Sequence, residues 1–219
     1  MKIVKPTTKH HMHAAWLKSE LFRMKPSLTS EQIKLIEQPD LNSPQENNER
    51  ENLIFNVYGR SAILNEIPSS LDWFEAEIES IDVDSIFILP VFDWYLDTGS
   101  TFKVANVPKH LSQNRGYRLN NEPPVVVHHH NKIEIMSKLA DLKTDDIVII
   151  SSNKQSTPLT IIDGTHRASL LVKNGKLVGA KVYFGVGSGL QNCIWSVERR
   201  DFAQHLFNLQ QLVQARVMW

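Results

Sequence analysis

The chain has 219 residues, 42% of them hydrophobic, so it is long enough to bury one sizeable core, or a core and a smaller satellite. Its 24 basic and 24 acidic side chains balance, without the basic excess typical of a duplex-DNA binder, and we therefore expect no nucleic-acid partner. The single cysteine, Cys193, excludes an internal disulfide and a multi-cysteine metal cluster, and it fits a reducing compartment.

The sequence contains no sign of membrane insertion. No apolar run is long enough to span a bilayer, and the first residues, MKIVKPTTKHHMH, lack the apolar core of a signal peptide. We therefore expect a cytoplasmic protein without a membrane partner.

The first third of the chain is predicted to be mainly helical. Apolar residues at helical spacing predict a helix over residues 10–24, and Thr29-Ser30 can cap a second helix. A polar loop is expected over 40–50 and a short helix over 70–79. These segments define a helical amino-terminal portion at residues 1–75.

The remainder, residues 76–219, mixes strand and helix patterns and predicts an α/β domain with a carboxy-terminal helix. In chain order we predict a β-rich run over 81–92, a turn-rich loop over 93–124, a helix over 131–142, strands over 146–150 and 159–162, a helix over 165–174, a strand over 176–184 and a terminal helix over 196–215.

The stretch Asp163-Gly164-Thr165-His166-Arg167, named here the DGTHR turn, carries the strongest functional signal. An apolar strand pattern changes there to helical spacing, and a strand that turns into a helix directs backbone N–H groups and the positive end of the helix dipole at an anion. Gly164 permits a close approach of the backbone to a ligand, and Thr165 adds a hydroxyl donor. Asp163 occupies the expected N-cap position, where its carboxylate would accept helix N–H bonds. His166 and Arg167 oppose the dipole unless an anion binds. Two alternatives remain: a capped helix with solvated cations, and a tight hairpin.

Residues 160–171 resemble the strand–DGxHR–helix motif of the ParB/sulfiredoxin-like superfamily, which includes CTP-binding partition proteins, ATP-using sulfiredoxins, free-serine kinases and proteins described as nucleases. The resemblance implies a small mixed sheet flanked by helices, and a nucleotide phosphate held by Gly164, Thr165, His166 and Arg167. Thr165 stands where sulfiredoxins carry their reactive cysteine, and the arginine-rich motif and helix-turn-helix module of the partition proteins are missing.

We therefore expect a nucleotide-binding protein that uses ATP or another nucleotide, with Mg²⁺, to phosphorylate a small hydroxyl-bearing molecule. Such an enzyme needs a carboxylate to orient the attacking hydroxyl. Asp93 and Asp97, which follow the apolar run IFILPVF, are the best placed by chain order, and Glu75 and Glu77 are weaker choices. The alternative is a non-catalytic nucleotide-binding or ParB-like regulatory module.

Three further patterns suggest other chemistry. Residues 96–100, LDTGS, match the catalytic turn of retroviral-type aspartic proteases, with Asp97 as the carboxylate, although the same residues favour ordinary turns. Histidines at 10–13 and 128–130 could bind a metal, but no carboxylate completes a ligand set and solvated side chains are the simpler interpretation. The glycine-rich run over 185–189 lacks the Lys-Ser/Thr of a P-loop and is predicted to be a turn.

Overall fold

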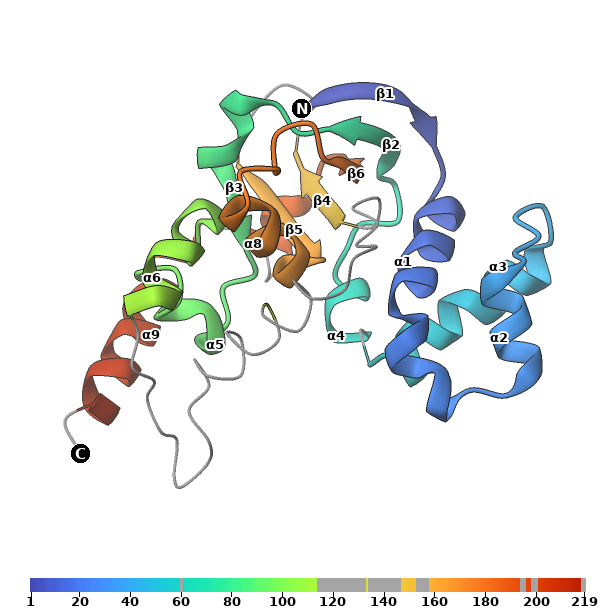
Figure 1. Ribbon diagram of the computed structural model, residues 1–219, viewed down its shortest axis with the longest axis horizontal. Coiled ribbons are helices and arrows are strands. Elements are labelled where there is room, and N and C mark those ends of the chain that lie inside the picture. The colour runs from blue at the N-terminus through green and yellow to red at the C-terminus, as the bar shows by residue number, and fades with distance from the viewer. Residues whose placement is uncertain are drawn as a thin grey trace.

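The computed structural model describes residues 1–59, 61–113, 133, 147–152, 158–193, 196–197 and 201–217, and Figure 1 shows the arrangement of their helices and strands. They form a mixed α/β fold built on a six-stranded sheet with the strand order β1-β2-β6-β4-β5-β3. The strands are β1 Lys2–Thr7, β2 Asp72–Glu77, β3 Ile86–Ile88, β4 Ile147–Ser151, β5 Leu159–Asp163 and β6 Lys181–Val186.

Helices lie on both sides of this sheet (Figure 1). The α-helices are α1 Lys9–Met24, α2 Ser30–Glu37, α3 Pro44–Asn52, α4 Ser61–Leu64, α5 Phe92–Tyr95, α6 Val107–Gln113, α8 Thr165–Lys173 and α9 Phe202–Val217. Shorter turns of helix are η1 Lys25–Ser27, η2 Leu53–Val57, η3 Ser80–Ser85, η4 Val104–Asn106 and η5 Leu190–Asn192, of which η2 is a π-helical turn.

The two faces of the sheet bury two different apolar clusters. Because successive side chains of a strand point to opposite faces, Ile147 and Ile149 belong to one cluster, and Val148 and Ile150 to the other. The first cluster includes residues of α5, α6, α8 and α9, and the second includes residues of α1, α2 and η2. The amino-terminal helices therefore cover one face of the same sheet.

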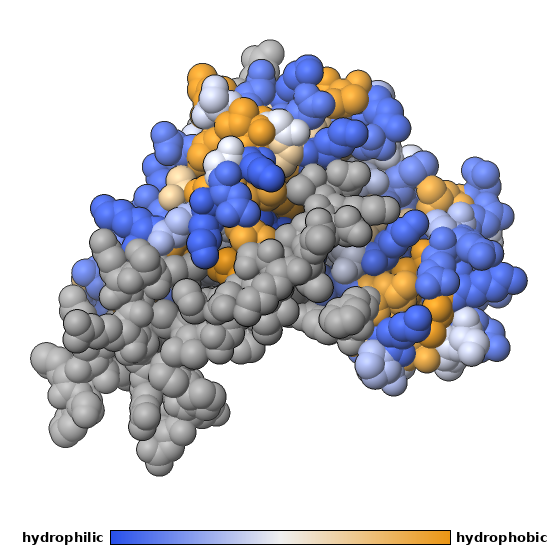
Figure 2. Space-filling view, in the orientation of Figure 1, coloured by the Kyte–Doolittle hydropathy of each residue, from blue (hydrophilic) through white to orange (hydrophobic). Residues whose placement is uncertain are grey.

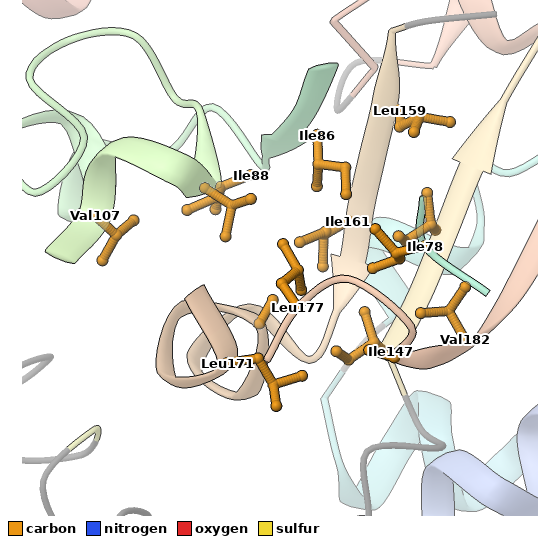
Figure 3. Close-up of a cluster of buried hydrophobic side chains, with 14 of the residues drawn as sticks. Ile78, Ile86, Ile88, Val107, Ile147, Leu159, Ile161, Leu171, Leu177 and Val182 are labelled. Carbon is orange, nitrogen blue, oxygen red and sulfur yellow. The ribbon is translucent and has the colours of Figure 1, made fainter. Parts of the chain in front are cut away.

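Helix α8, which follows the DGTHR turn, packs on the first of these faces. Ala168, Leu170 and Leu171 are its buried apolar residues, at the helical spacing that the sequence predicts. Figure 3 shows Leu171 beside the strands that carry Ile147 and Ile161. This packing fixes the direction in which the start of the helix points.

The strand directions bring two chain segments to one edge of the sheet. Strand β3 pairs in parallel with β5, with Ile86 opposite Leu159 and Ile88 opposite Ile161. Their carboxyl ends therefore lie at the same edge, where the antiparallel strand β4 begins and Val148 pairs with Asp163. The segment after β3, which contains α5, and the segment after β5, which contains the DGTHR turn, both leave the sheet there.

Several predicted elements are confirmed. The helix expected over 10–24 is α1, and the second helix is α2, for which Thr29 provides the N-cap of a capping box with Gln32. The strands and helix around the DGTHR turn are β4, β5 and α8, and the terminal helix is α9. The helix expected over 131–142 falls outside the described residues, apart from Ile133.

Two predictions in the amino-terminal portion are wrong, and the portion also contains a strand that was not predicted. Residues 70–79 were expected to be helical but contain strand β2, which pairs with β1 on one side and β6 on the other. Residues 2–7 form an edge strand, so the portion over 1–75 is not wholly helical. The loop expected over 40–50 contains most of α3, which begins after the N-cap Ser43.

The outward surface of this amino-terminal layer is mostly polar, with a smaller group of apolar residues between the helices (Figure 2). Within the part of the chain that the structure describes, no helix is both long enough and apolar enough to cross a bilayer.

Candidate functional site

The predicted strand–turn–helix is present at the DGTHR turn. Strand β5 ends at Asp163, Gly164 takes a left-handed conformation with φ of +87°, and α8 begins at Thr165. The Ala168 N–H donates to the Gly164 carbonyl over 2.9 Å, which is the first hydrogen bond of the helix. Gly164 occupies the N-cap position of α8, so Asp163 stands one residue before the position where the sequence predicted it. The tight-hairpin alternative is excluded, because residues 165–173 are helical.

The structure gives Gly164 a packing role. A Cβ atom at this position would lie 3.0 Å from both the Cα and the Cγ1 atom of Ile147 in β4. The backbone that approaches Gly164 closely is therefore the neighbouring strand. Together with the positive φ, this contact explains why glycine is required, with or without a ligand.

Arg167 lies between two carboxylates of the chain. Its Nη2 donates to Asp163 Oδ2 over 3.3 Å, and its Nη1 donates to Glu20 Oε1 of helix α1 over 3.1 Å. The Tyr58 hydroxyl donates to the other Asp163 oxygen, Oδ1, over 3.3 Å. All three charged side chains are nearly buried, with exposed fractions of 11% for Arg167, 12% for Glu20 and 4% for Asp163.

These ion pairs correct the electrostatic argument made from the sequence. Arg167 was expected to be a cation in need of an external anion, but Glu20 and Asp163 already provide negative charge. The alternative of a merely solvated arginine is also wrong, since the side chain is almost buried.

His166 packs against an aromatic ring. Its imidazole lies 5.0 Å from the ring of Trp94 between centroids, with the two planes tilted by 57°. Trp94 belongs to α5, the helix that follows β3. The contact confirms that the segment after β3 lies beside the DGTHR turn, as the pairing of β3 with β5 requires.

Asp97 lies in the turn that ends α5 and is fully buried, with 0% exposure. Thr98 fixes this turn: its hydroxyl donates to the Trp94 carbonyl over 2.8 Å, and the Phe102 N–H donates to that hydroxyl over 3.0 Å. The LDTGS residues therefore form a helix-ending turn. A protease needs an accessible carboxylate that meets its symmetry mate, so the burial of Asp97 disfavours that alternative.

The other predicted carboxylates are placed less favourably or are not described. The side chain of Asp93, on α5, is outside the described part of the structure. Glu75 and Glu77 lie on β2 and pair with lysines of the edge strand, Glu75 with Lys5 at 3.0 Å and Glu77 with Lys2 at 2.9 Å. The facing of Asp93 or Asp97 toward the DGTHR turn stays a prediction.

Reasoning from the sequence missed Glu20 and Tyr58, both of which contact the charged residues of the turn. A signal for Glu20 was present in α1, because this acidic residue occupies the apolar face of an amphipathic helix. Trp16, Leu17 and Met24, which lie three or four residues away, are all buried. Tyr58 carries no comparable signal.

The structure describes the surroundings of His13 and of two glycines in the glycine-rich run. Within the described residues, no group of three or more His, Cys, Asp or Glu side chains could hold a metal ion. His13 is buried, and burial lowers its pKa to about 3, so it is neutral at pH 7. Histidines 128–130 are outside the described residues. A Cβ atom on Gly185 would lie 2.9 Å from the ring of Trp73, so a glycine fits the packing there, and a Cβ atom on Gly187 would lie 2.7 Å from a terminal methyl group of Leu71.

Comparisons with protein-family models, curated protein sequences and solved structures gave no match to this chain. The superfamily resemblance of the DGTHR turn thus rests on the sequence motif alone.

Proposed function

We propose that the protein binds a nucleotide through its phosphates at the DGTHR turn and transfers a phosphoryl group to a small hydroxyl-bearing molecule. The observation that carries the proposal is the start of α8, where a left-handed glycine, which has no side chain of its own to cap the helix, leads into the first turn. Backbone N–H groups and the helix dipole favour an anion at such a position. The Thr165 hydroxyl and the Arg167 guanidinium supply further hydrogen-bond donors.

Carboxylates for the transfer step are available near this turn. A general base must come within hydrogen-bond reach of the hydroxyl whose proton it takes. Asp163 and Glu20 contact Arg167 directly, whereas Asp97 is fully covered and would have to become exposed before a substrate could touch it. Asp163 and Glu20 therefore join Asp93 and Asp97 as candidates to orient the acceptor or to hold Mg²⁺ with the nucleotide.

The second candidate function is a non-catalytic nucleotide-binding module. The charged side chains at the turn favour such a module over a pocket that binds a bare anion. The negative charges of two carboxylates, Glu20 and Asp163, exceed the single positive charge of Arg167, so binding needs either Mg²⁺ or a rearrangement of these ion pairs. Formation of a phosphorylated product from ATP separates the enzyme from the binding module.

Calorimetric titration with ATP, CTP and ADP, with and without Mg²⁺, tests the binding step. Arg167→Ala should weaken binding by about 1.5–3 kcal/mol, the usual contribution of a charged hydrogen bond, which is roughly a ten- to hundredfold loss of affinity. Lys173→Ala is the matched control, because it removes one positive charge from the exposed far end of the same helix. Equal binding by the wild type and the folded Arg167→Ala variant, or no binding by the wild type, would refute the proposal.

A further inference from the structure

We infer that Glu20 competes with a bound phosphate for Arg167 and thereby sets the affinity of the site for phosphate. This inference rests on the proposed function. Glu20 reaches the DGTHR turn from helix α1, 147 positions earlier in the sequence. Its Oε1 atom accepts a hydrogen bond from Nη1 of Arg167 over 3.1 Å, and Nη1 is a charged donor that a phosphate could otherwise use.

The two carboxylates around Arg167 differ in how readily a ligand can replace them. Asp163 lies four residues before Arg167, ends β5 and receives a second hydrogen bond from Tyr58. It is therefore fixed by the turn itself. Glu20 belongs to a separate element, so exchanging its contact with Arg167 leaves the strand–turn–helix unchanged.

Helix α1 does not need to move for this exchange. Trp16 and Leu17, one turn before Glu20, are 0% exposed and anchor the helix in the core. The exchange therefore calls for a change in the side-chain torsions of Glu20 and not for a movement of the helix. A phosphate can then take the released donor while Asp163 keeps Nη2, so the arginine remains paired in both states.

Competition by Glu20 changes phosphate affinity in the opposite direction from a structural role of Glu20. If Glu20 only oriented Arg167 for the ligand, its removal would weaken phosphate binding. If Glu20 competes, removing its charge strengthens binding, because the phosphate no longer has to displace a carboxylate and no longer meets its repulsion. The two roles therefore predict opposite changes in affinity for the same substitution.

The test compares phosphate affinity in Glu20→Gln, Glu20→Asp and the wild type by calorimetric titration with inorganic phosphate and with ATP, each with and without Mg²⁺. The amide oxygen of glutamine can still accept from Arg167, and the shorter aspartate keeps the charge with a weaker contact. Glu37→Gln is the control, since it removes a carboxylate from the exposed end of α2.

We expect the Mg²⁺-free affinity to rise about tenfold in Glu20→Gln, the factor that corresponds to 1.4 kcal/mol, with Glu20→Asp between it and the wild type and Glu37→Gln unchanged. Binding to Glu20→Gln alone would also support the inference. If the wild type binds and Glu20→Gln binds equally or more weakly, the competition is refuted while the proposed function stands. If no variant binds any probe, the proposed function fails and the inference fails with it.

Discussion

Replacement of Arg167 by alanine should destabilise the fold, and the size of the effect follows from its ion pairs. The change removes contacts of 3.1 Å to Glu20 and 3.3 Å to Asp163 and leaves two nearly buried carboxylates close to each other without this cation. Removing one partner of a buried ion pair costs about 3–5 kcal/mol. Because Arg167 and Glu20 keep some exposure, we expect the low end of that range, about 3 kcal/mol.

The sequence alone predicts the opposite sign. Without knowledge of Glu20, a cation in the first turn of α8 opposes the helix dipole, and its removal should stabilise the helix by about 0.3–1 kcal/mol. The sign of the measured change therefore decides whether the ion pairs or the dipole dominates at this position.

Urea unfolding followed by tryptophan fluorescence gives the change in the free energy of unfolding. The double variant Arg167→Ala/Glu20→Gln should lose less stability than the sum of the two single changes, since the second substitution removes a carboxylate that the first leaves without this partner. Lys173→Ala should stay within about 0.5 kcal/mol of the wild type, as expected for an exposed surface change. An Arg167→Ala variant as stable as the wild type, or more stable, would refute the ion-pair argument.

Three further changes test the local structure by the same unfolding assay. Gly164→Ala should lower the free energy of unfolding by about 2–3 kcal/mol, because its positive φ is combined with a 3.0 Å contact between the new Cβ atom and Ile147. The control Gly179→Ala, with φ of +83° and open space around the Cβ atom, should lower it by only about 1 kcal/mol. Equal losses would contradict the packing role of Gly164. Burial lowers the pKa of His13 from 6.5 to about 3, so the unfolded chain takes up a proton at a higher pH than the folded protein does. The free energy of unfolding should therefore fall as the pH drops below 6.5, by at most about 1.4 kcal/mol per pH unit. His13→Leu should reduce this slope, and an unchanged slope would refute the assignment. Thr29→Ala removes the capping box of α2 and should cost about 1 kcal/mol, and no loss would mean that this cap is dispensable.

The amino-terminal helices show why apolar patterning recovered only part of the fold. Helix α1 has the expected apolar face, whereas α3 is almost entirely polar and was read as a loop. Its residues Asn47 and Arg50 are buried and held by hydrogen bonds, with Arg50 donating to Glu46 and to the Asp40 carbonyl. The better signal was the capping sequence Ser-Pro-Gln-Glu over residues 43–46, in which the Ser43 hydroxyl accepts from the Glu46 N–H.

Strand β2 illustrates the opposite case, in which tertiary pairing overrides a local preference. Its sequence DWFEAE contains good helix formers and was expected to be helical. In the sheet, β2 lies between β1 and β6 and pairs antiparallel with both, so Trp73 faces Gly185 and Phe74 faces Phe184. These partners come from residues more than 100 positions later in the chain, and strand preference depends on such neighbours more than on the segment itself.

The backbone conformation of the candidate site could be predicted from the sequence, but its ion pairs could not. The change from an apolar strand run to helical spacing at residues 163–165 is local, and it located the turn correctly. The segment that contains Asp93 and Asp97 was selected by chain order alone, and it lies beside the turn because β3 and β5 pair in parallel and end at the same edge, a pairing that the sequence did not predict. Burial of Asp97 and the ion pair between Glu20 and Arg167 depend on contacts between distant segments, which neither spacing nor order encodes.

The position of Glu20 changes how a ligand at the DGTHR turn has to be understood. An isolated arginine at a helix start would bind any phosphate, since nothing opposes the approach of the anion. With Glu20 and Asp163 in contact with Arg167, binding becomes an exchange of one negative group for another, and only the difference between the two contributes to affinity. If a nucleotide binds here as proposed, its Mg²⁺ would satisfy the displaced carboxylate while its phosphate pairs with the guanidinium, so we expect the ion pairs that oppose a bare phosphate to favour a metal-bound nucleotide.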